Sequence, residues 1–303
     1  MPALFSGLMK PEYRVRPSQW IRRVWRGLQT PPPTACVRLP WGSELEIIPE
    51  ETIGRQIYHM GVFDLSVSET LWRLTDPGTT AFDIGGNIGY TCSILARAAG
   101  PTGRVHAFEP HPEVVVKLRN NVARWPAPPH AAVTVHEMAL GRSTGTIKLC
   151  MPDGFGDNHG LASIHESVGG TRTVPVTLQT VDAMQSSVGA PSIIKIDVEG
   201  AEEDVLEGSH ALLSSGRTRD VVFEDSGDMP TPPCKVLTRH GYKVFALRVS
   251  EAGPVVTPVG EPTLPLRSWD TPSYLATLDV KRMRERFAAP GWRCLSAKPG
   301  AGC

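Results

Sequence analysis

Apolar residues follow two alternating patterns through the central part of the chain. Short runs rich in β-branched and aromatic residues are typical of buried strands, and they alternate with stretches of helical periodicity. The predicted strands are residues 80–84, 104–108, 133–139, 192–196, 220–223, 243–247 and 274–278. The predicted helices are residues 88–99, 112–123, 201–213, 233–240 and 280–287. This alternation predicts an α/β fold with a mostly parallel sheet and helices on both faces.

The segments outside this alternation divide the chain further. The sequence predicts a hairpin over residues 36–48 and a helix over residues 52–74, which ends before Asp76-Pro77-Gly78. Residues 141–192, rich in Gly, Thr and Ser, predict an insertion of short strands, and the Pro-rich residues 254–272 a loop. We therefore expect four parts. They are a basic extension (1–35), a hairpin with a helical cap (36–79), a core (80–250) that contains the insertion, and a Pro-rich loop, last strand and tail (251–303).

The N-terminal extension is strongly basic. Seven Lys or Arg residues and one acid, Glu12, occur between Met1 and Arg38. Residues 20–26 predict a short amphipathic basic helix, which the three prolines at 31–33 end. One interpretation is docking to an acidic carrier, a partner or a membrane surface. The interpretation that we favour at this stage is an appendage whose tryptophans pack on the main body.

Composition narrows the function classes. Lys plus Arg and Asp plus Glu both number 31, so the chain lacks the basic surplus typical of a nucleic-acid partner. The six cysteines form neither a C-x-x-C pair nor a zinc-type cluster, and a disulfide framework is not expected without a secretory signal. No signal pattern and no run of ~20 apolar residues occurs, so we expect no membrane span and a cytoplasmic location.

The first predicted strand ends in a Gly-rich turn that follows Asp83. Glycines allow a backbone to turn tightly and to approach a ligand, and the next helix points its first amides at the same place. The dinucleotide fingerprint G-x-G-x-x-G fails, because Asn87 and Tyr90 stand where its second and third glycines belong. Asp83 instead places a carboxylate within reach of an ammonium group. A purely structural turn is the alternative.

The next two strand ends complete a nucleoside-binding pattern. Glu109 lies twenty residues after Gly89 (109 − 89), the interval at which an acid meets ribose hydroxyls in such folds. A carboxylate accepts hydrogen bonds from both hydroxyls of a vicinal diol. Glu137 and Met138, at the third strand end, are expected near an adenine ring. The alternatives are that Glu109 is a surface residue at a strand end and that Met138 is a core residue.

The fourth strand ends in Lys195-Ile196-Asp197-Val198-Glu199-Gly200-Ala201-Glu202. Charges directly after an apolar run are costly to bury without partners, so we expect Asp197 and Glu199 where the cofactor meets its acceptor. Glu202 instead suits the first turn of the next helix, where negative charge is favoured. Glu224, after the fifth strand, brings another carboxylate to the same rim.

Together these segments resemble the FkbM-type methyltransferases. The resemblance covers roughly residues 45–250 and includes Asp182; Gly86 stands where the family commonly has Ala. The residues that carry it are 82–91, Phe108-Glu109-Pro110, Asn120-Asn121 and 194–202. It implies a class I methyltransferase fold and S-adenosylmethionine as donor. Most often it implies transfer to a hydroxyl oxygen of a sugar, a polyketide-type natural product or a peptide, with nitrogen as a known alternative.

Methyl transfer requires alignment of donor and acceptor and the removal of one proton. We expect the methionine part of the donor to be held by Asp83, Gly85, Gly86, Asn87 and Gly89, and the ribose by Glu109. Asp197 and Glu199 would position or deprotonate the acceptor, with His159 as a second candidate base. No metal is expected, although a divalent cation held by Asp197, Glu199 and Glu224 is an alternative.

Three other function classes stay open. An oxidoreductase that uses a nicotinamide cofactor shares the sheet but conflicts with the failed fingerprint. A nucleic-acid methyltransferase would be expected to show a basic cleft and often an Asn-Pro-Pro-aromatic run after the fourth strand, where this chain has the acidic Asp197-Val198-Glu199-Gly200. A module that binds S-adenosylmethionine without turnover would keep the turn and lack activity. We expect the binding partner to be a small-molecule, glycan or peptide acceptor. The sequence leaves the oligomeric state open.

Overall fold

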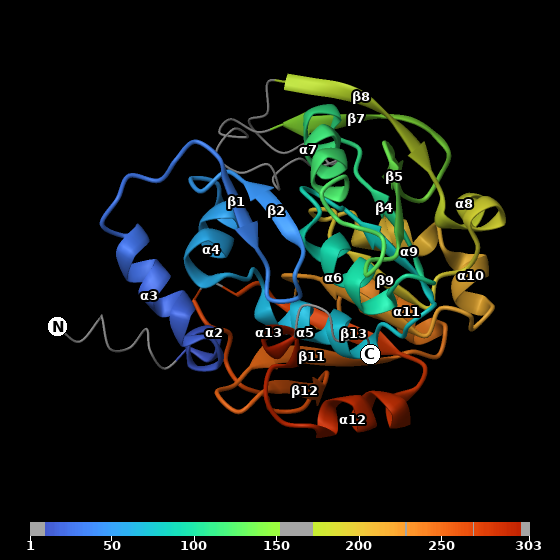
Figure 1. Cartoon of the computed structure of the whole chain (residues 1–303). Helices are drawn as coiled ribbons and strands as arrows, with labels where there is room; N and C mark the ends of the chain where they lie inside the picture. The colour runs from blue at the N-terminus through green and yellow to red at the C-terminus, as the bar shows by residue number, and fades with distance from the viewer. Residues whose placement is uncertain (1–9, 152–171, 228, 269, 298–303) are drawn as a thin grey trace.

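The computed structural model describes residues 10–151, 172–227, 229–268 and 270–297. An eight-stranded sheet, in the order β12-β11-β13-β10-β9-β3-β4-β5, forms its centre (Figure 1). The strands are β3 (Thr80–Ile84), β4 (Arg104–Phe108), β5 (Ala132–His136), β9 (Ile193–Ile196), β10 (Asp220–Glu224), β11 (Lys243–Val249), β12 (Pro254–Pro258) and β13 (Ser273–Thr277). Strands β5, β4, β3, β9 and β10 pair in parallel, and β13 is antiparallel to both β10 and β11.

Helices cover both faces of this sheet, as predicted. Consecutive residues of β9 show why: Ile193 belongs to one apolar cluster with α5 and α6, and Ile194 to a second cluster with α9 and α11. The helices are α4 (Thr52–Met60), α5 (Leu65–Leu74), α6 (Tyr90–Ala99), α7 (Pro112–Val122), α8 (Val181–Val188), α9 (Glu202–Glu207), α10 (His210–Ser214), α11 (Pro232–Arg239), α12 (Val280–Ala288) and α13 (Arg293–Ser296). The predicted class I methyltransferase fold is thereby confirmed. Among the described residues, no helix is both long and apolar enough to cross a bilayer.

Two predicted helices are each broken into two. Residues 52–74 form α4 and α5, because Gly61 ends the first in a left-handed conformation and Asp64 caps the second by accepting a hydrogen bond from Val67 N at 3.0 Å. Residues 201–213 form α9 and α10, which meet at Gly208 and Ser209. Apolar periodicity continued through both breaks, and it hid them.

Two predicted boundaries in β structure are also corrected. The predicted strand 133–139 ends at His136, and Ala139 begins β6 (Ala139–Leu140) in a separate sheet with β8 (Arg172–Gln179) and β7 (Gly145–Met151). The Pro-rich residues 254–272 are not all loop, because 254–258 form β12 at the edge of the main sheet. Proline is tolerated there since an edge strand leaves some N–H positions unused.

The N-terminal part of the described chain joins the body through the hairpin of β1 (Ala35–Arg38) and β2 (Glu44–Ile47) and two helices, α2 (Pro11–Val15) and α3 (Pro17–Arg26). Figure 1 shows α3 at the margin of the molecule, beside α4. The predicted amphipathic basic helix is therefore present. The expectation that its tryptophans pack on the body is wrong for Trp25, which is exposed to solvent.

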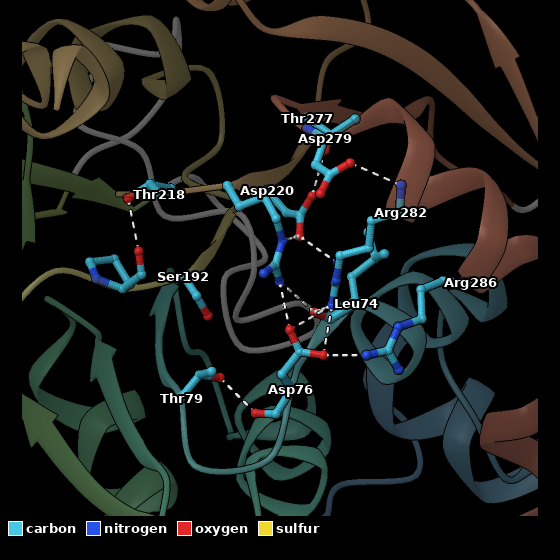
Figure 2. Close-up of polar contacts among 12 residues, drawn as sticks. Leu74, Asp76, Thr79, Ser192, Thr218, Asp220, Thr277, Asp279, Arg282 and Arg286 are labelled. Atoms are coloured by element: carbon cyan, nitrogen blue, oxygen red, sulfur yellow. Dashed lines mark hydrogen bonds and ion pairs between the residues drawn. The ribbon is translucent and has the colours of Figure 1, made fainter. Parts of the chain in front are cut away.

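A polar network holds the C-terminal helices to the sheet at the edge opposite the Gly-rich turn. Figure 2 shows Asp76, Asp220, Arg282 and Arg286 converging there, with Arg282 Nη2 2.7 Å from both carboxylate oxygens of Asp76. A second, fully buried pair lies in α5, where Arg73 Nε donates to Glu69 Oε1 at 2.6 Å.

That buried pair binds the tail through its backbone. Arg73 donates to the carbonyl oxygens of Arg286, Ala289 and Gly291 at 2.7–2.9 Å. The carboxylate of Glu69 accepts from the backbone N–H groups at positions 293 and 294. Four of the five N–H groups of Arg73 and both carboxylate oxygens of Glu69 are thus hydrogen-bonded, which offsets the cost of burying the ion pair.

Candidate active site

The Gly-rich turn connects β3 to α6 and approaches β9 closely. A Cβ at Gly85, where φ is +81°, would lie 1.8 Å from the carbonyl oxygen of Asp197, so only glycine fits. At Gly86 the nearest atom to such a Cβ is the Leu118 side chain at 3.3 Å, and φ is ordinary. Gly89, with φ of +96°, packs against Leu118. Gly85 and Asn87 line a cavity of about 200 Å³, whereas Gly86 and Gly89 shape the turn behind it.

Asp83 lies beneath this turn and is fully buried. Both of its carboxylate oxygens accept from the Thr91 hydroxyl at 2.9 Å. Burial raises the pKa of Asp83 to about 6, against the opposing charge of Lys195. Asp83 does not line the cavity in this structure, so it supports the turn from below.

Glu109, directly after β4, joins the second strand end to the turn. Its Oε2 accepts from Asn87 N and its Oε1 from His111 N, each at 2.9 Å. A carboxylate oxygen has two lone pairs, so each can still accept a hydrogen bond from the cavity that Glu109 lines. Burial raises the pKa of Glu109 to about 7 despite these two donors.

The two residues at the third strand end separate. Met138 lines the cavity. Glu137 is about half exposed and forms an ion pair with Arg119 at 2.9 Å outside it. Of the two, the structure brings only Met138 to the site.

The end of β9 supplies a charged cluster. Lys195 Nζ lies 2.9 Å from Asp197 Oδ2 and 3.4 Å from the carbonyl oxygen of Gly85. Burial alone would lower the pKa of this lysine, but the carboxylates of Asp197 and Asp83 raise it, so it stays charged. Asp197 and Glu199 both line the cavity.

Glu199 has an unusual backbone, with φ of +51° in a non-glycine residue. Such conformations are retained where the surroundings determine them and are frequent at functional sites. Partial burial, together with the nearby Asp197 and Glu202, raises the pKa of Glu199 to about 7. Glu202 itself accepts from the backbone N–H groups of Val198 and Gly200, which fits its predicted role at the start of the helix.

Glu224 is a cavity residue that the sequence placed at this rim, where its only suggested role was as a ligand of the alternative divalent cation. It ends β10, next to β9, and lines the same cavity. Burial, followed by the carboxylates of Asp197 and Asp64, raises the pKa of Glu224 to about 9. Its position one strand from Asp197 was the signal in the sequence. His159 falls in residues 152–171, outside the described residues.

A second cavity of about 560 Å³ adjoins the first, and Thr52, Phe63 and Thr271 line both. Its walls include Arg23 of α3 and Arg55 and His59 of α4. Burial and the charges of three arginines lower the pKa of His59; these are Arg23, Arg26 and Arg55. No sequence pattern connected α3 with the active site, and this wall was not predicted. In the described ranges, no group of three or more His, Cys, Asp or Glu side chains is arranged to hold a metal ion.

The strand order of the sheet is that of class I methyltransferases, and an acidic cavity lies at the ends of β3, β4 and β9. Residues 83–244, more than half of the chain, match the Methyltransferase FkbM domain family. The chain belongs to this family. The membership confirms the predicted family and its S-adenosylmethionine cofactor.

Among known proteins, the chain is similar to the hexuronic acid methyltransferase AglP of Haloferax volcanii, with 32% identity over 171 residues. That segment is 50% of this chain and 66% of AglP, just under two thirds of the relative. The chain is also similar to two solved structures. The FkbM methyltransferase of Methylobacillus flagellatus has 17% identity and a TM-score of 0.44, and the match covers 74% of this chain and 54% of that chain. An O-methyltransferase of Thermotoga maritima has 16% identity and a TM-score of 0.41, and the match covers 81% of this chain and 77% of that chain.

Proposed function

We propose that this protein transfers a methyl group from S-adenosylmethionine to a hydroxyl oxygen of an acidic sugar or a related anionic small molecule. One observation carries the proposal: the cavity lined by Glu109, which we assign to the donor, adjoins a second cavity whose wall contains Arg23 and Arg55. The two cavities provide a place for donor and acceptor side by side. The similarity to a hexuronic acid methyltransferase supports the same acceptor class.

The donor side fits S-adenosylmethionine by the chemistry of its residues. Glu109 offers one free lone pair on each oxygen to a vicinal diol, and Asn87 and Gly85 line the adjoining wall. When bound, S-adenosylmethionine supplies an activated methyl group, so the protein needs to align the acceptor and accept one proton. Met138 lines the wall where we expect the adenine.

The carboxylates at the ends of β9 and β10 divide the remaining work. We assign Glu199 as the base that accepts the hydroxyl proton, because a pKa of about 7 suits proton transfer near neutral pH. Asp197, fixed by Lys195 at 2.9 Å, positions the acceptor. Glu224, with a pKa of about 9, is protonated at neutral pH and donates a hydrogen bond to the acceptor.

The second cavity, which we assign to the acceptor, selects acceptors by their charge. Arg23 and Arg55 line the second cavity, and after burial their charges are among the causes that lower the pKa of His59 in the same wall. Two acids line the same cavity, and both are engaged by other groups. Asp270 is bound by Arg267 at 2.7 Å, and buried Asp64 accepts hydrogen bonds from Val67 N at 3.0 Å and from the Ser273 hydroxyl at 3.1 Å. A carboxylate on the acceptor is therefore the group that this wall favours.

Initial rates with S-adenosylmethionine and paired acceptors, a uronic acid glycoside and the matching neutral glycoside, test the proposal. We expect methylation of the acidic acceptor, and in Arg55→Gln a KM for it raised about tenfold with kcat unchanged. Arg239→Gln is the matched control, since Arg239 lies on the surface of α11 and pairs with Glu207. Equal rates on both glycosides would contradict the charge selection. If product analysis located the methyl group on nitrogen, the acceptor group would be an amine and not a hydroxyl. If the protein bound the donor but turned over no acceptor, it would be a binding module.

A further inference from the structure

The helix α3 exposes its apolar face to solvent, whereas an ordinary surface helix exposes its polar face. Ile21, Val24, Trp25 and Leu28 recur at helical spacing from α3 into the turn after it, and all four are exposed. The exposed fractions are 63% for Ile21, 60% for Trp25 and 81% for Leu28. An amphipathic helix on a globular protein normally buries such an apolar stripe.

The opposite, polar face of α3 makes the contacts with the body. Gln19 is buried and donates to the His59 carbonyl at 3.2 Å, and Arg23 donates to the Tyr13 hydroxyl at 2.7 Å. Arg26 donates to the Tyr58 carbonyl, and its guanidinium carbon lies 4.1 Å from the centre of the Tyr58 ring. These hydrogen bonds fix the rotation of the helix and hold the stripe of Ile21, Trp25 and Leu28 outward.

The charge around this stripe has a single sign. The helix contains three arginines, Arg22, Arg23 and Arg26, and no acid. The acid nearby in sequence, Glu12, is buried and forms an ion pair with Arg267 at 2.9 Å. A basic helix with an outward apolar face that includes tryptophan has the composition of helices that lie in a membrane interface.

We propose that α3 docks this protein onto a bilayer surface that contains anionic lipid. Ile21, Trp25 and Leu28 enter the boundary between headgroups and acyl chains, and Arg22 lies at the level of the lipid phosphates. The apolar side chains alone would give a weak site, and the basic residues add an attraction of roughly fivefold in affinity each. This docking is separate from methyl transfer and holds whether or not the proposed acceptor is correct.

Co-sedimentation of the full chain with vesicles tests the docking. The probes are phosphatidylcholine vesicles with and without about one quarter phosphatidylglycerol. We expect binding to the anionic vesicles, and at least ~10-fold weaker binding by the triple variant Ile21→Ser, Trp25→Ser, Leu28→Ser. Arg22→Glu should weaken binding to anionic vesicles and leave the neutral ones unchanged.

A matched control removes exposed apolar residues elsewhere. The triple variant Val116→Ser, Leu264→Ser, Leu278→Ser alters side chains that are 37–50% exposed and distant in sequence from α3. It should bind like the unaltered protein, and circular dichroism should show both triple variants folded. The proposal is overturned if the unaltered protein does not bind anionic vesicles, or if the α3 variant binds equally well. It is also overturned if sedimentation shows a dimer that the α3 variant dissociates, because a second copy then covers the stripe.

Discussion

Replacement of Glu109 by Ala tests the donor site most directly. Each oxygen of this carboxylate accepts one backbone N–H and has one lone pair left for a ribose hydroxyl. Hydrogen bonds to a charged acceptor contribute about 1.5–3 kcal/mol each. The loss of two, taken at the lower limit, weakens donor binding by about 3 kcal/mol, which is roughly a 100-fold increase in Kd.

The same substitution has a separate effect on stability. The N–H groups of Asn87 and His111 lose their buried acceptor, which costs roughly 1–3 kcal/mol each unless water replaces it. We therefore expect Glu109→Ala to unfold at a lower temperature and still to fold. Thermal unfolding measured beside the binding titration separates the two effects.

Isothermal titration with S-adenosylhomocysteine measures the affinity. Glu137→Ala is the matched control, because Glu137 is the same residue type at the next strand end but lies outside the cavity, paired with Arg119. We expect its affinity to equal that of the unaltered protein. An unchanged Kd in Glu109→Ala, or an equal loss in Glu137→Ala, would refute the role of Glu109.

The pH dependence of binding provides a second readout. Glu109 has a pKa of about 7, and its ionised form is the better acceptor for hydroxyls. The affinity of the unaltered protein should therefore rise between pH 6 and pH 8. Glu109→Ala should lose that part of the slope, whereas the contributions of other acids in the cavity remain.

Three further sets of substitutions probe the turn, the cavity and the buried ion pair. Gly85→Ala should abolish donor binding or folding, whereas Gly86→Ala should retain both in the same titration, because only the first places a Cβ against backbone. Glu224 has a folded pKa of about 9, above its unfolded value, so its contribution to stability is present at low pH and is lost as the pH rises through 9. Glu224→Gln should flatten this fall in denaturant unfolding from about pH 5 to about pH 9, and an unchanged slope would contradict the raised pKa. Arg73→Met leaves the Glu69 carboxylate buried without its partner and should lower the free energy of unfolding by about 3–5 kcal/mol, with a smaller loss in Glu69→Gln/Arg73→Met.

The sheet was predictable because each parallel strand buries both of its faces and leaves a continuous apolar run in the sequence. The helix breaks were less accessible. Gly61 and Asp64 interrupt residues 52–74 without interrupting their apolar spacing, so the decisive signals were a left-handed glycine and a capping acid. The start of β12 was hidden by its prolines, which an edge strand tolerates.

The donor cavity was also accessible from sequence, because strand ends in a parallel sheet meet at one edge. Glu109 and Asp197 were found in this way, and both line the cavity. Glu137 shows the limit of the argument, since it directly follows β5 but its side chain pairs with Arg119 outside the cavity. The arginine-lined wall depends on how α3 lies against α4, a long-range contact that no local pattern encodes. The same holds for which face of α3 points outward.

The buried pair of Glu69 and Arg73 joins two stretches that both lie outside the family-matched residues 83–244. One stretch precedes that region in the sequence and the other follows it, yet each supplies the groups that neutralise the other's polar atoms. Shortening the chain before Gly291 would remove one carbonyl acceptor of Arg73 and both backbone N–H donors to Glu69, and would leave these buried groups partly unsatisfied. The two flanks therefore depend on each other for folding.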